Sequence, residues 1–300
     1  FGLGGVGKEL KDLLNPARLL DIMRNFSLFS SNKKKQRMKI IPRFQQYEGA
    51  NKIVERVVEG KIKKGLIWHF QGSGKSLLMV FAAQKLRREA KLKSPTVIVL
   101  VDRTDLDTQI SGIFNAADIA NVESTESIRE LQQMLERDTR KIIVSTIHKF
   151  RDAKPNMNTR DNIIVLVDEA HRTQEGDLGR QMRAALPNAF LFGLTGTPVN
   201  KADKNTFWAF GAEEDQGGYM SRYTFHDSIR DEATLPLHFE PRLVDVHIDK
   251  ESLDKAFADF KESQALSDED ADALNKKSAK MAAFLKSPER ITRIAEDIAI

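Results

Sequence analysis

A glycine-rich segment has the residue types and the spacing that bind phosphate. Residues 71–76 read QGSGKS, follow a short apolar run at 66–70 and open a pattern typical of a helix. Glycines let consecutive backbone N–H groups point at one anion, and the helix N-terminus adds its positive dipole end. Lys75 would reach the β- and γ-phosphates of a nucleotide, and the Ser76 hydroxyl would ligate Mg²⁺. The strict pattern has glycine where this chain has His69, so a glycine-rich turn before a core helix is the alternative.

An acidic pair, Asp168 and Glu169, directly follows the apolar run 163–167. Beside a phosphate loop, an acid at the end of a strand can hold Mg²⁺ through water, and a second acid can polarise the attacking water. Taken alone, the pair is equally compatible with a helix cap. A zinc site fits less well, since nearby His171 has no second histidine at helical spacing. With the phosphate loop upstream, we favour the nucleotide interpretation.

Polar residues in four other segments could contribute to the same site. The turn 195–197 reads TGT, and its hydroxyls could contact the acidic pair and sense the nucleotide. Gln46, with Arg43 nearby, has an amide that can pair with the donor and the acceptor edge of adenine. Segments 102–106 and 145–149 carry hydroxyl, arginine and lysine groups that could hold the phosphates of a nucleic-acid strand. Separately, each is explained as well by an ordinary turn, an exposed glutamine or a capped loop.

Apolar runs that alternate with helical patterns position these segments. The expected strands are 66–70, 96–101, 141–145, 163–167 and 189–194, and the expected helices are 44–59, 76–91 and 124–137. Runs that are apolar throughout are typical of strands covered on both faces. Strands separated by helices predict an α/β fold with a doubly wound, mostly parallel sheet, whose ligands bind beyond the carboxyl ends of the strands.

Other segments flank this pattern. Residues 9–29 have leucines at helical spacing, and Pro16 suits a break or the first turn of a second helix. We expect residues 30–39 to form a polar, basic linker, 236–248 to be extended, and 251–285 to be acidic and helix-like.

Composition excludes several classes of protein. Hydrophobic residues make up 41% of the 300 residues and charged residues 30%, which excludes intrinsic disorder and collagen-like repeats. No apolar run approaches the roughly 18 residues of a membrane-spanning helix. The chain has no cysteine, which excludes disulfides and thiolate chemistry. Residues 1–75 carry 16 Lys and Arg against 6 Asp and Glu, a block that could attract phosphate backbones or form a solvated surface.

Taken together and in this order, the segments resemble the ATP-driven motors of helicase superfamily 2, and more narrowly the R subunit of type I restriction–modification enzymes. The resemblance is carried by residues 66–76 (LIWHFQGSGKS), 101–106 (VDRTDL), 167–174 (VDEAHRTQ) and 193–198 (GLTGTP), with support from 15–26 and 223–243. That family shares the departure at His69. The resemblance implies a RecA-like P-loop NTPase domain flanked by helical segments.

The resemblance also implies roles for particular residues. Catalysis would fall to Lys75, Glu169 and His171, and Mg²⁺ would be held by Ser76 and Asp168. The residues expected to bind ATP are Arg43, Gln46, Gly72, Ser73, Gly74, Lys75, Ser76, Thr195, Gly196 and Thr197. The residues expected to contact double-stranded DNA are Arg103, Thr146 and Lys149, and His148 stands where the family has glutamine.

An organisation and a function follow from the same resemblance. Residues 1–40 would be a helical linker after a nuclease domain, 41–235 the first RecA-like motor domain, and 236–300 the connection to a second. Because the chain starts at Phe1 without a leader and ends at Ile300 inside an expected helix, we expect part of a longer, cytoplasmic protein.

That protein would hydrolyse ATP to translocate duplex DNA before cleavage, with methyltransferase and specificity subunits as partners. One alternative is another superfamily 2 motor, from type III restriction or DNA repair, which residues 9–29 disfavour. The other is a nucleotide-gated binding module without hydrolysis, which Glu169 disfavours.

Overall fold

The computed structural model describes residues 11–236, apart from 12, 32–36, 102–111, 113, 115–118, 120, 172–176 and 200–205, together with 291, 292 and 294–296. The chain divides into two compact units, one from Phe1 to Leu235 and one from Pro236 to Ile300. In the second unit, residues 291, 292 and 294–296 are helical, in line with the helix expected at the end of the sequence. The expected extended run after Pro236 and the acidic stretch 251–285 lie outside the described residues.

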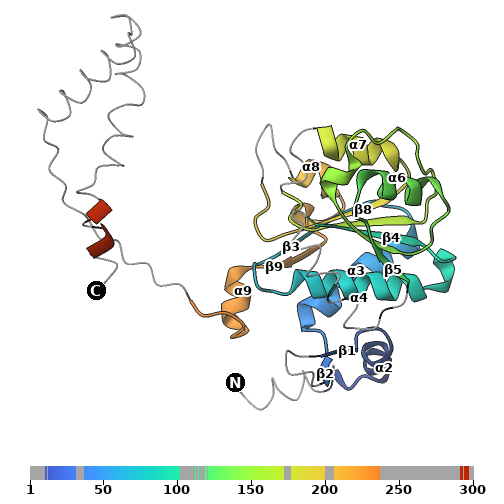
Figure 1. Cartoon of the computed structure of the whole chain (residues 1–300). Coiled ribbons are helices and arrows are strands. Elements are labelled where there is room, and N and C mark those ends of the chain that lie inside the picture. The colour runs from blue at the N-terminus through green and yellow to red at the C-terminus, as the bar shows by residue number, and fades with distance from the viewer. Residues whose placement is uncertain are drawn as a thin grey trace, which may run out of the picture. The chain divides into compact units, whose positions relative to one another are not determined.

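A seven-stranded sheet forms the centre of the first unit, and every neighbouring pair of strands in it is parallel (Figure 1). Its strands, in spatial order, are β5 (Val122–Ser124), β6 (Ile142–Thr146), β4 (Thr96–Val101), β7 (Ile163–Val167), β8 (Phe190–Thr195), β3 (Lys64–His69) and β9 (Ser221–Tyr223). The predicted α/β fold with a doubly wound parallel sheet is therefore confirmed.

Helices cover both faces of this sheet (Figure 1). One face carries α3 (Phe44–Glu59) and α4 (Lys75–Arg88), and the other carries α6 (Ile128–Glu136), α7 (Asp177–Ala185) and α8 (Thr206–Phe210). Alternate residues of β4 enter the two cores, Val97 and Val99 on the α3–α4 side and Ile98 and Leu100 on the other. Burial on both faces explains why the central strands are apolar throughout.

Strands 96–101 and 163–167 have the bounds expected from the sequence, and the other three expected strands differ by one or two residues at their ends. The two edge strands, β5 and β9, were not expected. Each has only three residues and includes an exposed position, so neither has the apolar run that marks the buried strands. The remaining short elements are α9 (Phe225–Arg230), η1 (Ala90–Leu92), η2 (Ile147–Phe150) and η3 (Gln216–Gly218).

A helix begins at Pro16, which agrees with the expected break or first turn of a second helix there, but it ends before residue 29, and residues 28–31 and 37–40 form strands where a linker was expected at 30–39. Helix α2 begins at Pro16, is capped by the Asn15 side chain and ends at Asn25. Strands β1 (Leu28–Ser31) and β2 (Arg37–Ile40) then pair as an antiparallel ribbon.

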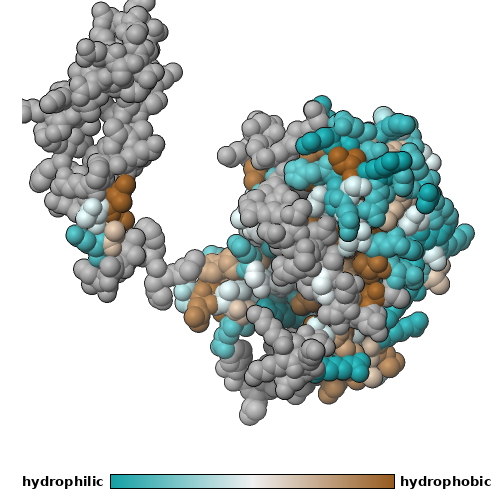
Figure 2. Space-filling model, in the orientation of Figure 1, coloured by the Kyte–Doolittle hydropathy of each residue, from teal (hydrophilic) through white to brown (hydrophobic). Residues whose placement is uncertain are grey.

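The helix ends at Asn25 because the next side chains belong to the core. Phe26 is fully buried against Tyr47 and Phe81, at ring distances of 4.8 and 5.5 Å, and Leu28 is buried with it. Several apolar side chains of α2 and the ribbon remain exposed, and Figure 2 shows apolar surface at this end of the first unit.

Candidate nucleotide-binding site

The carboxyl ends of β3, β7 and β8 bring the phosphate loop, the acidic pair and the 195–197 turn together. Lys75 Nζ donates to the carbonyl oxygen of His69 at 3.4 Å. A Cβ built on Gly196 would lie 3.5 Å from Lys75 Nζ and 3.3 Å from the backbone N of Gln71. These three segments, which span residues 71–197 of the sequence, therefore meet at one edge of the sheet, because parallel strands end on the same side.

The phosphate loop has the backbone form that its glycines permit. Gly72 and Gly74 have φ of 86° and 85°, in the left-handed region where other residues are strained, and α4 begins directly after Gly74. The Ser73 side chain is 2% exposed, and its hydroxyl has no hydrogen-bond partner among the described residues. A buried hydroxyl without a partner, at the N-terminus of a helix, fits the oxygen of a bound phosphate.

The acidic pair occupies the turn after β7. Asp168 is buried, and its Oδ1 accepts from the backbone N–H of Glu169 at 3.0 Å. Glu169 itself has a φ of 47°, a left-handed conformation that strains a residue with a side chain and is frequent at functional sites. Asp168 directly follows β7, and Ser76 lies in the first turn of α4, which follows β3 and the phosphate loop. The described residues contain no cluster of three or more His, Asp or Glu that could hold a metal ion.

Hydrogen bonds link the acidic segment to the 195–197 turn, as the sequence predicts. His171 Nδ1 lies 2.9 Å from Thr195 Oγ1 and 3.3 Å from Glu169 Oε2. Thr195 Oγ1 also accepts from the backbone N–H of Thr197 at 3.1 Å. On the other side of the turn, the indole N–H of Trp68 donates to Gly196 O at 3.1 Å. A shift in one segment therefore changes the hydrogen bonds of the other.

Two glutamines at the start of α3 hold the phosphate loop from outside. Gln46 Nε2 donates to the carbonyls of Ser73 and Gly74 at 3.3 and 3.1 Å, and its Oε1 accepts from the backbone N–H of Arg43. Both amide protons of Gln46 are thus engaged by the loop, so pairing with adenine through them requires the amide to leave it. Gln45, which the sequence did not single out, also donates to Ser73 O at 3.4 Å.

His69, at the position where the strict motif has glycine, is a buried residue. Its ring is 1% exposed and its Nε2 lies 2.9 Å from Ser221 Oγ. Burial, and then the charges of Lys75 and Lys52, lower the pKa of His69 to about 3. The ring has room because α3 carries glycine opposite it: a Cβ on Gly49 would lie 3.3 Å from His69 Cε1. In the sequence, the sign that residue 69 is unusual was its histidine, which stands where the strict motif has glycine.

Of the three residues expected to contact DNA, one is buried, one is hydrogen-bonded within the chain and one lies outside the described residues. Thr146 is buried at the end of β6, and Lys149 Nζ donates to the carbonyl oxygen of Thr125. Arg103 lies outside the described residues. The structure thus places Thr146 and Lys149 on the carboxyl side of the sheet, where three strands (β4, β7 and β8) separate β6 from β3 and the phosphate loop.

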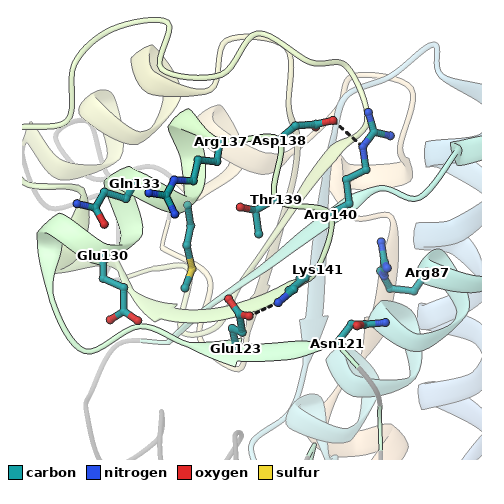
Figure 3. Close-up of a pocket in the computed structure, with 11 residues that line it drawn as sticks. Arg87, Asn121, Glu123, Glu130, Gln133, Arg137, Asp138, Thr139, Arg140 and Lys141 are labelled. Atoms are coloured by element: carbon teal, nitrogen blue, oxygen red, sulfur yellow. Dashed lines mark hydrogen bonds and ion pairs between the residues drawn. The ribbon is translucent and has the colours of Figure 1, made fainter.

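A separate cavity of about 570 Å³ lies at the amino end of β6 (Figure 3). Charged side chains line it, and they pair with one another: Lys141 with Glu123, and Arg140 with Asp138. This cavity contains none of the residues that the sequence singles out.

No helix among the described residues is long and apolar enough to cross a membrane.

Known proteins match this chain in sequence. The family model for the SWI2/SNF2 ATPase matches residues 45–271. A putative type I restriction enzyme MjaIXP endonuclease subunit of Methanocaldococcus jannaschii is 30% identical, over 96% of this chain and 28% of its own length. The type I restriction enzyme HindI endonuclease subunit of Haemophilus influenzae is 34% identical, over 96% of this chain and 29% of its own length.

Among solved structures, the SWI2/SNF2 ATPase core of Sulfolobus solfataricus in complex with dsDNA is similar, with a TM-score of 0.45 and 15% identity, over 63% of this chain and 36% of that one. The present chain spans less than a third of the length of the two restriction-enzyme subunits. The family match covers the phosphate loop, the acidic pair and the 195–197 turn, and the chain therefore belongs to the SWI2/SNF2 ATPase family of helicase superfamily 2.

Proposed function

We propose that this chain binds ATP with Mg²⁺ at the phosphate loop and hydrolyses it. The observation that carries the proposal is the buried hydroxyl of Ser73, which has no hydrogen-bond partner in the described part of the chain and lies inside a loop whose glycines are left-handed. Lys75, 9% exposed, and Asp168, 6% exposed, lie at the same edge of the sheet. Buried polar groups that the protein itself does not satisfy are a feature of ligand sites.

The proposed roles follow from what each group can do. The backbone N–H groups of 72 and 74–76 would bind the phosphates, since that of Ser73 donates to Phe70 O at 3.1 Å, and Lys75 would turn from the His69 carbonyl to the β- and γ-phosphates. Ser76 and Asp168 would hold Mg²⁺, which neutralises charge on the phosphates when bound. Glu169 would accept a proton from the attacking water.

The groups around this centre have supporting roles in the proposal. His171 would orient Glu169 through their 3.3 Å contact. Because His171 also hydrogen-bonds to Thr195, and Thr195 to the N–H of Thr197, a movement of Glu169 would change the hydrogen bonds of the 195–197 turn. Arg43 and Gln46 would contact adenine, with Gln46 exchanging its hydrogen bonds to the loop for hydrogen bonds to the base. That exchange would release the loop when the nucleotide arrives.

We further propose that the chain is the first motor domain of a type I restriction enzyme R subunit, with the domain at 41–235 and the connection to a second motor domain after it. The similarity to two endonuclease subunits over 96% of the chain supports this proposal. ATP hydrolysis would drive translocation on duplex DNA, and Arg103, Thr146 and Lys149 would contact the DNA. Methyltransferase and specificity subunits would be its partners, in the cytoplasm.

Calorimetric titration with ATP and Mg²⁺ tests the nucleotide site. We expect the chain to bind with micromolar to millimolar affinity and Lys75→Ala to abolish detectable binding, because that change removes the charge aimed at the phosphates. Lys141→Ala is the matched control, since it removes a lysine at the amino end of β6, away from the loop. Unchanged affinity in Lys75→Ala would refute the assignment.

A further inference from the structure

His69 joins the end of β3 to the edge strand β9. The register places His69 opposite Tyr223 and Ile67 opposite Ser221, so the imidazole and the Ser221 side chain lie on the same face of the sheet. Their polar atoms, Nε2 and Oγ, are 2.9 Å apart, and both residues are buried, at 1% and 2% exposed. The contact is therefore a hydrogen bond screened from water, where such bonds are strongest.

The chemistry of the ring determines which atom donates. The low pKa of His69 means that the ring is neutral and carries one N–H. His69 Nδ1 is buried and has no partner among the described residues. A proton on Nδ1 would be a buried donor without an acceptor, which costs about 1–3 kcal/mol. With the proton on Nε2, Nδ1 is instead an unpaired acceptor, which is tolerated more often than an unpaired N–H, so this arrangement favours donation from Nε2 to Ser221 Oγ.

The groups that face the ring favour this neutral state. Lys75 on α4 and Lys52 on α3 contribute positive charge, and the ring of Tyr223 on β9 meets it edge-on at 6.1 Å. Gly49 of α3 lies against the ring on the remaining side. None of these groups supplies a negative charge that would favour protonation.

The main chain of the same residue contacts the phosphate loop. The carbonyl oxygen of His69 accepts from Lys75 Nζ, while the next residue, Phe70, donates its N–H to Tyr223 O at 2.8 Å. The Phe70 ring also packs on Phe225 of α9, at 4.8 Å between centroids. β9 and α9 are the last elements of the first unit before the chain passes to the second unit at Pro236.

We propose that His69 is a positioning residue that transmits occupancy of the phosphate loop to β9 and α9. When Lys75 leaves the His69 carbonyl for a phosphate, the end of β3 changes its hydrogen bonds, and the imidazole carries that change to Ser221. A glycine at this position, as in the strict motif, would leave nucleotide binding intact but remove the link. This inference rests on the proposed nucleotide site.

Hydrogen–deuterium exchange of the whole 300-residue chain, with and without Mg²⁺ and a non-hydrolysable ATP analogue, tests the link. In the parent chain we expect the nucleotide to slow exchange at 66–76 and also at 221–230. In His69→Gly and in Ser221→Ala, the effect at 66–76 should persist, while the effect at 221–230 falls by about fivefold, the change expected from one hydrogen bond. His69→Gln, whose amide N can replace Nε2, should restore it.

Tyr223→Phe is the matched control, because it keeps the ring that lies against His69 and removes only the hydroxyl, whose side-chain hydrogen bonds are with Asp231 and Ser228. It should leave the nucleotide effect at 221–230 unchanged. Equal effects at 221–230 in the parent, His69→Gly and Ser221→Ala would overturn the inference while leaving the nucleotide site in place. Absence of binding by the parent chain in calorimetry would instead overturn the proposed function and, with it, this inference.

Discussion

Polar side chains at the carboxyl ends of the parallel strands differ in burial and hydrogen bonding from those at the amino ends. At the carboxyl edge, Lys75 and Asp168 are buried, and the polar atoms Ser73 Oγ and His69 Nδ1 have no hydrogen-bond partner in the described part of the chain. At the amino end of β6, the charges that line the cavity of Figure 3 are partly exposed and pair with one another. Among the described residues Asn25 Oδ1 and Arg160 Nε also lack a hydrogen-bond partner, so the carboxyl side is distinguished by two such atoms lying in and beside a loop with left-handed glycines.

The largest contrast should appear in catalysis. In the full-length protein, Glu169→Gln should lower the rate of ATP hydrolysis by about 10²–10⁴-fold, because an amide cannot accept the proton of the attacking water. ATP affinity should change little. Glu123→Gln, at the amino end, should leave both quantities unchanged. Steady-state kinetics and titration check the prediction, and hydrolysis at the parent rate by Glu169→Gln would remove Glu169 from this role.

Replacing two left-handed glycines by alanine should lower the free energy of unfolding by different amounts. Gly74→Ala should lower the free energy of unfolding by about 3 kcal/mol, from left-handed strain and from displacing the Gln46 amide, which a Cβ would meet at 2.1 Å. Gly60 has a similar φ of 73° but open space around it, so Gly60→Ala should cost only about 1 kcal/mol. Urea unfolding measures both, and equal losses would mean that Gln46 does not brace the loop.

Acid should destabilise the carboxyl edge through His69. Its folded pKa, about 3, is below the unfolded value of 6.5, so between these values the unfolded chain binds the extra proton. Stability is therefore complete above pH 6.5 and falls as the pH falls, by about 2 kcal/mol at pH 5 for this residue. His69→Gln should flatten that part of the pH dependence in urea unfolding. The same slope in both proteins would contradict burial of a neutral imidazole.

The smallest effect is expected at the amino end. Lys141 and Glu123 form an ion pair with side chains 40% and 35% exposed. A double-mutant cycle with Lys141→Ala and Glu123→Ala should give a coupling free energy of about 0.2–1 kcal/mol, because water and salt screen exposed pairs. A coupling above about 2 kcal/mol would show that this cavity is built more rigidly than its exposure indicates.

Local pattern was enough to predict much of the molecule. The buried strands are recognisable because both faces are covered, and the strands at 96–101 and 163–167 have the expected bounds. The turn at 71–76 followed by a helix was predictable because its glycines permit left-handed backbone, which Gly72 and Gly74 adopt directly before α4. Alternation of strands and helices was sufficient to predict that the strand-end segments would lie at one edge.

Contacts between distant residues were decided only by the tertiary structure. The end of α2 at Asn25 depends on burial of Phe26 against α3 and α4, and the short strands β5 and β9 depend on strands that they lie beside. The pairing of His69 with Ser221 joins residues 152 apart, and Gln46 contacts a loop 27 residues away. The residue types permit these contacts, but the folding of the sheet selects them, because a side-chain hydrogen bond is determined by position in space and has no period in the sequence.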